Sequence, residues 1–207
     1  EYTADNLKRP KLTEKPVECF SLAEQKQIEH AIRSGKKDKL YGIILCLYSG
    51  LRIGELMALQ WSDIDFVKGV LTVSKSCHDG KDGLIIDEPK TVTSRRVIPL
   101  PKQLLPILKL WKKRSGSPFV VSSNGKPVPV RSYQRSFELL LKKLKITHKG
   151  FHSLRHTFAT RALECGMDVK TLSEILGHKN PTVTLNRYAH SLMEHKQDMM
   201  NRLGKLL

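Results

Sequence analysis

Four short segments of the sequence hold side chains that can bind an anion, move a proton or act as a nucleophile. In chain order, their central residues are Arg52 with Glu55, then Lys90, then His152, Arg155 and His156, then His178 and, ten residues later, Tyr188. Guanidinium and ammonium groups bind phosphate oxygens, imidazoles transfer protons near neutral pH, and a tyrosine hydroxyl attacks an electrophile when it loses its proton. Each segment alone also has a structural explanation: a helix-start ion pair, a charge at a hairpin tip, a helix-ending histidine, or a core tyrosine.

The charge of the chain favours a polyanionic partner. Its 207 residues include 36 Lys or Arg against 20 Asp or Glu, a net charge of +16. The excess of basic residues lies almost entirely after Leu100. Lys and Arg that neutralise phosphates release condensed counterions, so this polarity favours nucleic acid over an anionic membrane or a merely solvated surface. No Lys/Arg-rich amphipathic helix with aromatic anchors supports the membrane alternative.

Composition indicates a globular protein without a membrane span or a disulfide scaffold. With 40% hydrophobic residues, the chain can bury about two-thirds of its extended surface on folding. The longest apolar stretch, Ile43 to Tyr48, is far shorter than the roughly 18 residues that a spanning helix needs. The four cysteines, Cys19, Cys46, Cys77 and Cys165, form no CxxC pair. We therefore expect a soluble, intracellular protein.

The elements that must position these residues are mostly helical. Ser21 with Glu24 is a capping box that predicts a helix reaching about Ile32, with Phe20 as a hydrophobic staple. Further helices are predicted from Asp38 to Gly50, Ile53 to Leu59, Leu104 to Trp111, Tyr133 to Leu144, Leu154 to Leu163 and Val169 to Leu176. Between Trp61 and Pro99, β-branched runs predict three antiparallel strands at 70–73, 84–86 and 96–98. Another short strand is predicted at 119–121. The expected fold class is α+β, mainly helical, with a small three-stranded antiparallel sheet.

Together and in this order, the four segments resemble the catalytic domain of the tyrosine recombinase family, the integrases of phages and conjugative transposons. The resemblance covers residues 21–190. The matching motifs are Gly50-Leu51-Arg52-Ile53-Gly54-Glu55-Leu56, Lys90-Thr91-Val92-Thr93-Ser94-Arg95-Arg96-Val97-Ile98-Pro99-Leu100, His152-Ser153-Leu154-Arg155-His156, Leu176-Gly177-His178 and Thr184-Leu185-Asn186-Arg187-Tyr188-Ala189-His190. The resemblance implies the tyrosine-recombinase catalytic-domain fold and a DNA strand transferase that cuts and rejoins DNA through a covalent 3′-phosphotyrosine.

The resemblance also assigns a role to each matched residue. The catalytic set is Arg52, Lys90, His152, Arg155, His178 and the nucleophile Tyr188. The two arginines would bind the non-bridging phosphate oxygens, Lys90 would protonate the leaving 5′-oxygen, His152 would assist at the phenol and His178 would donate a hydrogen bond to the phosphate. Glu55 would orient Arg52, and His156 would pack structurally. DNA contacts are expected from Thr91, Ser94 and Arg96, and no metal or other cofactor is expected.

The predicted domain organisation has three parts. Residues 1–20 are basic and contain prolines, which indicates a linker from an N-terminal core-binding domain. Residues 21–190 form the catalytic domain, and residues 191–207 form a helical tail with an apolar stripe. The tail is expected to dock on a neighbouring protomer of a homotetramer on double-stranded DNA. The alternative is that it packs on its own domain.

Other interpretations of the same residues remain open at this stage. Residues 169–188 can form a helix-turn-helix with a turn at Gly177, which would make the protein a non-enzymatic DNA-binding regulator. His152 and His156 lie four residues apart, as in some metal sites, but Ser153 stands where the glutamate of H-E-x-x-H would be. A type IB topoisomerase would share the phosphotyrosine chemistry, although the arginine and L-G-H motifs fit integrases better.

Overall fold

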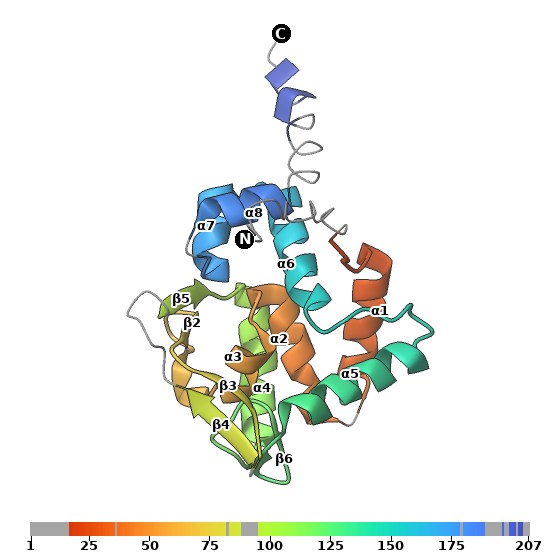
Figure 1. Ribbon diagram of the computed structural model, residues 1–207, viewed down its shortest axis with the longest axis vertical. Coiled ribbons are helices and arrows are strands. Elements are labelled where there is room, and N and C mark those ends of the chain that lie inside the picture. Colours follow the sequence, from red (N-terminus) through yellow and green to blue (C-terminus); the bar gives the residue numbers. More distant parts are fainter. Residues whose placement is uncertain are drawn as a thin grey trace, which may run out of the picture.

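The computed structural model describes residues 17–35, 37–81, 83–87, 95–178 and 180–188, with 196, 199–201, 203 and 204 near the C-terminus. Three of the predicted site residues, Lys90, Thr91 and Ser94, therefore lie outside the described part of the chain. So do most of the predicted linker and most of the predicted tail. Figure 1 shows the helices gathered around one central helix, with the small sheets along one side.

The central helix is α2 (Tyr41–Ser49), whose apolar run is buried on nearly every side. It follows a short 3-10 turn, η1 (Asp38–Leu40), and packs against α6 (Ser153–Glu164) and α1 (Leu22–Arg33). A short helix, α3 (Ile53–Ala58), comes directly after it. Because α2 has no polar face, it can only be stable when other elements surround it.

The helix ends follow the local sequence signals. At the start of α1, Glu24 N donates to Ser21 Oγ at 3.2 Å and Ser21 N donates to Glu24 Oε2 at 2.7 Å, which confirms the capping box. At the end of α2, Gly50 adopts a left-handed φ of 65°, as a helix-ending glycine does. Phe20 is not a staple, because the position it would contact in α1 is polar. Its ring packs edge-on against Phe137 in the core.

The predicted three-stranded antiparallel sheet is present, but one of its strands was predicted wrongly. Its order is β1 (Ile64–Asp65), β2 (Val70–Val73) and β5 (Arg96–Pro99), with Val73 opposite Arg96. The predicted strand at 84–86 belongs to β4 (Gly83–Asp87), which pairs with β3 (Ser76–Gly80) in a separate hairpin. A tight turn makes the sequence neighbour β3 the nearest partner for β4. That hairpin packs against α3 and α5.

The other helices match their predicted ranges to within a few residues. They are α4 (Leu105–Arg114), preceded by the turn η4 (Lys102–Leu104), then α5 (Val130–Lys143) and α7 (Val169–Leu176). A last short helix, α8 (Pro181–Arg187), lies in a segment that was expected to be helical only in the helix-turn-helix alternative. A further 3-10 turn, η2 (Trp61–Asp63), precedes β1. The predicted strand at 119–121 is only a single bridge between Phe119 and Gln60, next to the short pair β6 (Ser122–Ser123) and β7 (Lys126–Pro127).

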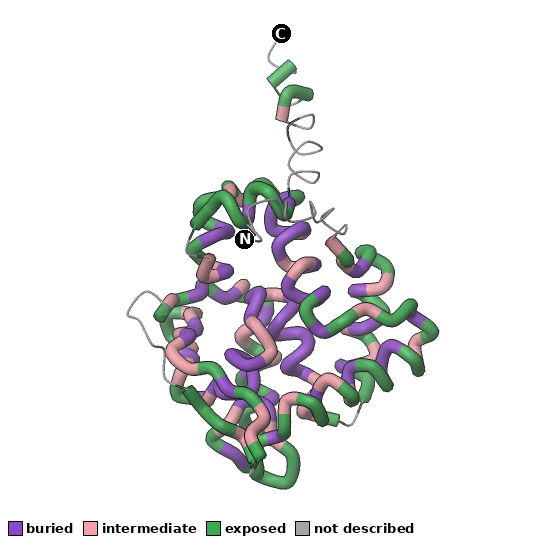
Figure 2. The backbone as a smooth tube through the Cα atoms, in the orientation of Figure 1, coloured by how far each residue is buried: buried purple, intermediate pink, exposed green. Residues whose placement is uncertain are grey.

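The interior has a large core around α2 and a second, smaller apolar cluster between α6 and α7 (Figure 2). The fully buried members of the second cluster are Ala159, Leu163, Leu172 and Leu176, and Tyr188 joins it from the end of α8. The short helices α7 and α8 are therefore held to α6 by apolar packing. Within the described residues, no helix is long and apolar enough to cross a membrane.

Candidate active site

Arg155 lies at the centre of the site, on α6, with 2% of its surface exposed. Its Nη1 donates to the carbonyl of Gly50 at 2.7 Å, and its Nη2 donates to the carbonyl of Leu176 at 2.6 Å. These carbonyls lie at the ends of α2 and α7, where the helix dipoles concentrate negative charge. Burial, followed by the positive charge of Arg52, lowers the pKa of Arg155, although the guanidinium stays protonated at neutral pH.

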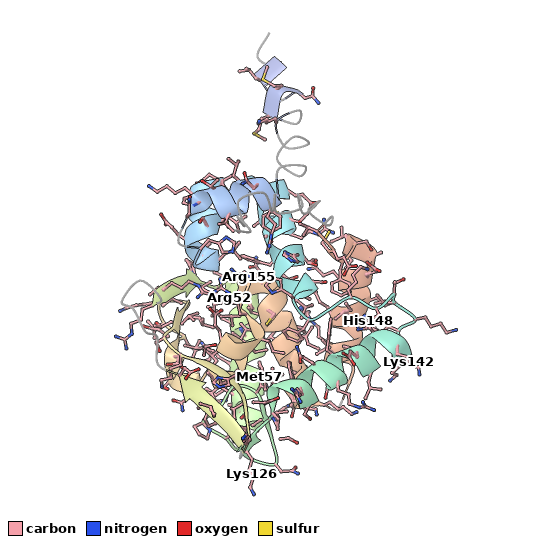
Figure 3. All side chains as sticks on the ribbon, in the orientation of Figure 1. Arg52, Met57, Lys126, Lys142, His148 and Arg155 are labelled. Carbon is pink, nitrogen blue, oxygen red and sulfur yellow. The ribbon has the colours of Figure 1, made fainter. Side chains whose placement is uncertain are left out.

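Arg52 is more accessible than Arg155. It is the residue before α3, and 42% of its side chain is exposed. Its Nη1 donates to Glu55 Oε1 at 3.0 Å, which confirms the predicted contact between these residues. Figure 3 shows Arg52 and Arg155 close together where α3 approaches α6. Two guanidinium groups this close repel each other, so an anion that binds both relieves that repulsion.

Glu55 is the anion that balances the arginines inside the protein. Besides the Arg52 side chain, it accepts the backbone N–H of Arg52 at 2.8 Å and two N–H groups of Arg96, each at 2.8 Å. Burial raises the pKa of this carboxyl, but hydrogen bonds and charge from Arg96 and then Arg52 outweigh burial, so the pKa is lowered overall. Glu55 is therefore ionised at neutral pH.

Arg96, which we expected to contact DNA, is bound inside the protein in this structure. Its side chain is only 10% exposed, and Nε donates to the carbonyl of Ile175 at 2.7 Å while the two Nη atoms bind Glu55. Arg96 thus ties β5 to α3 and α7. The motif gave no sign of this because the partners lie 41 and 79 residues away.

His178 is held on both ring nitrogens. Its Nε2 lies 3.0 Å from Arg155 Nη2, and its Nδ1 lies 2.7 Å from Thr184 Oγ1. Because arginine has no acceptor, Nε2 accepts and the proton is on Nδ1, which donates to Thr184. Burial and the nearby arginines lower the pKa of His178 to about 4. We expected His178 to donate to a phosphate, whereas in this structure its Nε2 accepts from Arg155.

Tyr188 is buried, with 3% exposure, and its hydroxyl lies 2.7 Å from Nδ1 of His156. Burial raises the pKa of Tyr188 to about 12, and burial with nearby cations lowers the pKa of His156 to about 4. We expected His152 to assist at the phenol and His156 to pack structurally. The imidazole in contact with the phenol is instead His156, and the ring of His152 lies edge-on against it at 4.6 Å between centroids.

The structure therefore brings five of the six predicted catalytic residues to one region, and the sixth, Lys90, is outside the described residues. Arg52, Arg155 and Arg187 all act electrostatically on His152, whose pKa burial and these charges lower. Sequence reasoning missed the contacts of His156 and Thr184. The motifs mark both positions, since His156 directly follows Arg155 in H-x-L-R-H and Thr184 stands one helical turn before Tyr188, but they do not identify the partners.

The chemistry of this arrangement suits a phosphate ester rather than a bound metal ion. Cationic and hydrogen-bonding groups surround a buried tyrosine hydroxyl, and such groups stabilise the negative charge of a phosphoryl transition state. Among the residues that the structure describes, no group of three or more His, Cys, Asp or Glu side chains is placed to hold a metal.

Comparison with known proteins gives a consistent result. Residues 20–195 match the phage integrase family. The chain is 32% identical to the XerC-like tyrosine recombinase of Caldanaerobacter subterraneus, over 93% of the chain and 55% of that protein. It is 27% identical to the ICEBs1 integrase of Bacillus subtilis, over 98% of the chain and 58% of that protein. The chain thus spans little more than half the length of these relatives.

Among solved structures, the chain is similar to the integrase of transposon Tn1549 in complex with transposon right-end DNA. The TM-score is 0.78 with 31% sequence identity, and the match covers 93% of this chain and 68% of that integrase. At this TM-score the two chains share the arrangement of their helices and sheets.

Proposed function

The chain belongs to the phage integrase family, and from that membership we propose that it is the catalytic part of a site-specific tyrosine recombinase. It would cut and rejoin double-stranded DNA through a covalent 3′-phosphotyrosine and serve the integration or excision of a mobile element, in the cytoplasm of a bacterial cell. This proposal rests on one observation: Arg52, Arg155 and His178 lie together, close to Tyr188 at the end of α8.

In the proposed reaction, the hydroxyl oxygen of Tyr188 attacks the scissile phosphorus while the bond from phosphorus to the 5′-oxygen breaks. We assign the acceptor of the phenolic proton to His152, and the donor of the proton that the 5′-oxygen takes up to Lys90. The 5′-hydroxyl of another strand then attacks the phosphotyrosine and releases Tyr188. Each step exchanges one phosphate ester for another, so the scheme needs no high-energy cofactor.

The protein's own cations supply the electrostatic stabilisation in this scheme. Negative charge grows on the non-bridging oxygens, and the guanidinium groups of Arg52 and Arg155 can bind those oxygens in pairs. One preorganised donor is worth about 3 to 4 kcal/mol, so a few donors account for a large part of an enzymatic rate enhancement. We propose that these side chains act without a metal ion.

The non-enzymatic regulator is the second candidate. The helices α7 and α8 do follow one another across Gly177, as a helix-turn-helix requires. However, the buried side of α8 carries Thr184 and the end of the helix carries Tyr188, which bind His178 and His156. A non-enzymatic regulator would have no use for a buried tyrosine hydroxyl that contacts an imidazole near Arg155 and Arg187, and therefore we favour the recombinase.

The test is covalent trapping on DNA. The chain is incubated with a pool of nicked suicide duplexes of randomised sequence and then separated on a denaturing gel. The parent chain and a Tyr48→Phe control, which loses a hydroxyl that binds Glu29, should form a protein–DNA adduct. Tyr188→Phe should form none. Equal adduct yields from the parent and Tyr188→Phe would sink the proposal.

We also propose that the C-terminal tail docks on a neighbouring protomer of a homotetramer on DNA. In the described part of the tail, Met200 and Leu203 are 61% and 58% exposed, so these apolar side chains are not buried by their own domain. Double substitution Met200→Ser and Leu203→Ser should weaken cooperative assembly on DNA, measured by analytical ultracentrifugation. A lowered melting temperature with unchanged assembly would instead favour packing of the tail on its own domain.

A further inference from the structure

His156 and Tyr188 form the one direct contact, among the described residues, between an imidazole and the hydroxyl of the proposed nucleophile. The two atoms, Nδ1 and the phenol oxygen, lie 2.7 Å apart, and the rings meet edge-on at 5.9 Å between centroids. His156 comes from α6, and Tyr188 stands at the end of α8, so the contact joins two elements that are 32 residues apart in sequence.

The direction of this hydrogen bond depends on which nitrogen of His156 carries the proton, and we assign that proton to Nε2. Burial and the neighbouring cations keep His156 neutral at physiological pH, and burial keeps the phenol protonated. A neutral imidazole accepts only through its unprotonated nitrogen, so with the proton on Nε2 the phenol donates to Nδ1. The edge-on ring of His152 packs against the same imidazole and restricts its rotation.

The place of His156 on α6 links the nucleophile to the phosphate site. Arg155, the preceding residue, is fixed by carbonyls of Gly50 and Leu176. Two consecutive residues of α6 therefore have linked roles: Arg155 would bind the phosphate, and His156 binds the phenol of Tyr188. Any displacement of α8 relative to Arg155 has to break or stretch the bond between His156 and Tyr188.

We propose that His156 is a positioning residue for Tyr188: by accepting the phenolic hydrogen bond, its Nδ1 sets the place of the nucleophilic oxygen relative to the phosphate bound by Arg155. This inference rests on the proposed recombinase function. It assigns His156 an orienting role rather than that of the proton acceptor, because a weakly basic imidazole holds a proton poorly. An uncharged acceptor of the same reach should therefore replace it.

The experiment compares His156→Asn with His156→Ala. The Asn Oδ1 takes nearly the place of Nδ1 and accepts a hydrogen bond, but it does not titrate. Adduct formation on suicide DNA is measured under single-turnover conditions from pH 5.5 to 9, beside DNA affinity at fixed salt. His148→Asn, an exposed histidine 3.9 Å from Glu138, is the matched control.

We expect His156→Ala to slow adduct formation about 100-fold, as loss of orientation does, with unchanged DNA affinity. His156→Asn should stay within about fivefold of the parent and keep its pH profile. A His156→Ala rate equal to that of the parent would overturn the inference. So would a His156→Asn variant that is as slow as His156→Ala, because that result identifies His156 as the proton acceptor.

A measurement without DNA separates this inference from the proposed function. With ¹³C-labelled tyrosine, the Cζ resonance of Tyr188, assigned through Tyr188→Phe, should shift in His156→Ala and return toward the parent position in His156→Asn. An unchanged resonance in His156→Ala would show that the contact is absent and refute the positioning role. If the hydrogen bond is seen but the parent forms no adduct, the proposed function fails instead.

Discussion

Replacing Glu55 by glutamine should destabilise the protein more than its small change in shape suggests. The carboxylate accepts four hydrogen bonds, two of them from Arg96, whose side chain is only 10% exposed. A glutamine amide turns an NH₂ group toward one of these donors and removes the negative charge. Breaking a buried pair in this way typically costs about 3 to 5 kcal/mol, because the remaining charge stays buried without compensation.

That cost is a large part of the total, since native domains are stable by roughly 5 to 15 kcal/mol. For a chain of this size it corresponds to a fall in melting temperature of about 6 to 20 °C. The matched control is Glu164→Gln, because Glu164 pairs with Arg161 at 2.7 Å but is 43% exposed. The control should lose no more than about 1 kcal/mol. Urea unfolding followed by circular dichroism measures both variants.

The difference between the parent and Glu55→Gln should depend on pH with a definite sign. Although burial raises the pKa of Glu55, its arginine partners lower it by more, so the folded-state pKa lies below the unfolded value. A group of this kind stabilises the fold fully above its unfolded pKa and loses that effect as the pH falls through its folded pKa. The two proteins should therefore differ fully at pH 7, and the difference should shrink as the pH falls below the ordinary pKa of a glutamate, about 4.3.

Two results would refute this reasoning. A loss in Glu55→Gln as small as that in Glu164→Gln would show that the cluster does not hold β5 to α3. A gap that stays constant down to pH 3 would show that the ionised carboxylate is not its source. In the double variant with Arg96→Met, the combined loss should be smaller than the sum of the single losses, because each single variant leaves a buried partner unpaired.

Two further predictions concern the contacts that hold His178. Thr184→Val removes the acceptor of the His178 Nδ1 proton, so we expect adduct formation to fall about 10- to 100-fold while the DNA affinity is unchanged; an unchanged cleavage rate would show that Thr184 does not orient the imidazole. Gly177→Ala should lower the free energy of unfolding by about 1 to 2 kcal/mol or more, because Gly177 has a φ of 67° and a Cβ there would come within 3.0 Å of Arg96 Cδ. A melting temperature equal to that of the parent would contradict this expectation.

The parts of the fold that the sequence predicts well are those set by neighbouring residues. The capping box at Ser21 and the helix-ending Gly50 each depend on contacts within about four residues, and both helix ends are confirmed. The prediction of the three-stranded sheet was wrong for the strand at 84–86, because strand pairing depends on which segments meet in space. The run 84–86 is mostly exposed and lacks the alternating burial that would have marked its partner.

For the candidate site, sequence reasoning identified the groups but not all of their partners. The contact between Arg52 and Glu55 was predictable, since it spans one helical turn. The contacts of Arg96 with Glu55 and of His156 with Tyr188 were not, since they span 41 and 32 residues and depend on how β5, α6 and α8 pack. A basic residue in such a motif suggests a phosphate contact, and only the tertiary structure shows that Arg96 binds the buried carboxylate of Glu55.

Gly50 and Gly177, each part of one of the matched motifs, are both needed to shape the site around Arg155. Gly50 and Gly177 both adopt left-handed backbone conformations that end α2 and α7. Each of these helix ends supplies one carbonyl to Arg155, and each glycine is followed within two residues by a proposed catalytic side chain, Arg52 or His178. An L side chain is disfavoured at such angles, and at Gly50 a Cβ would come within 2.5 Å of Phe158. The same two turns therefore orient the buried arginine and direct the chain that carries its neighbours, so changes at either glycine should act on the whole anion site rather than on a single residue.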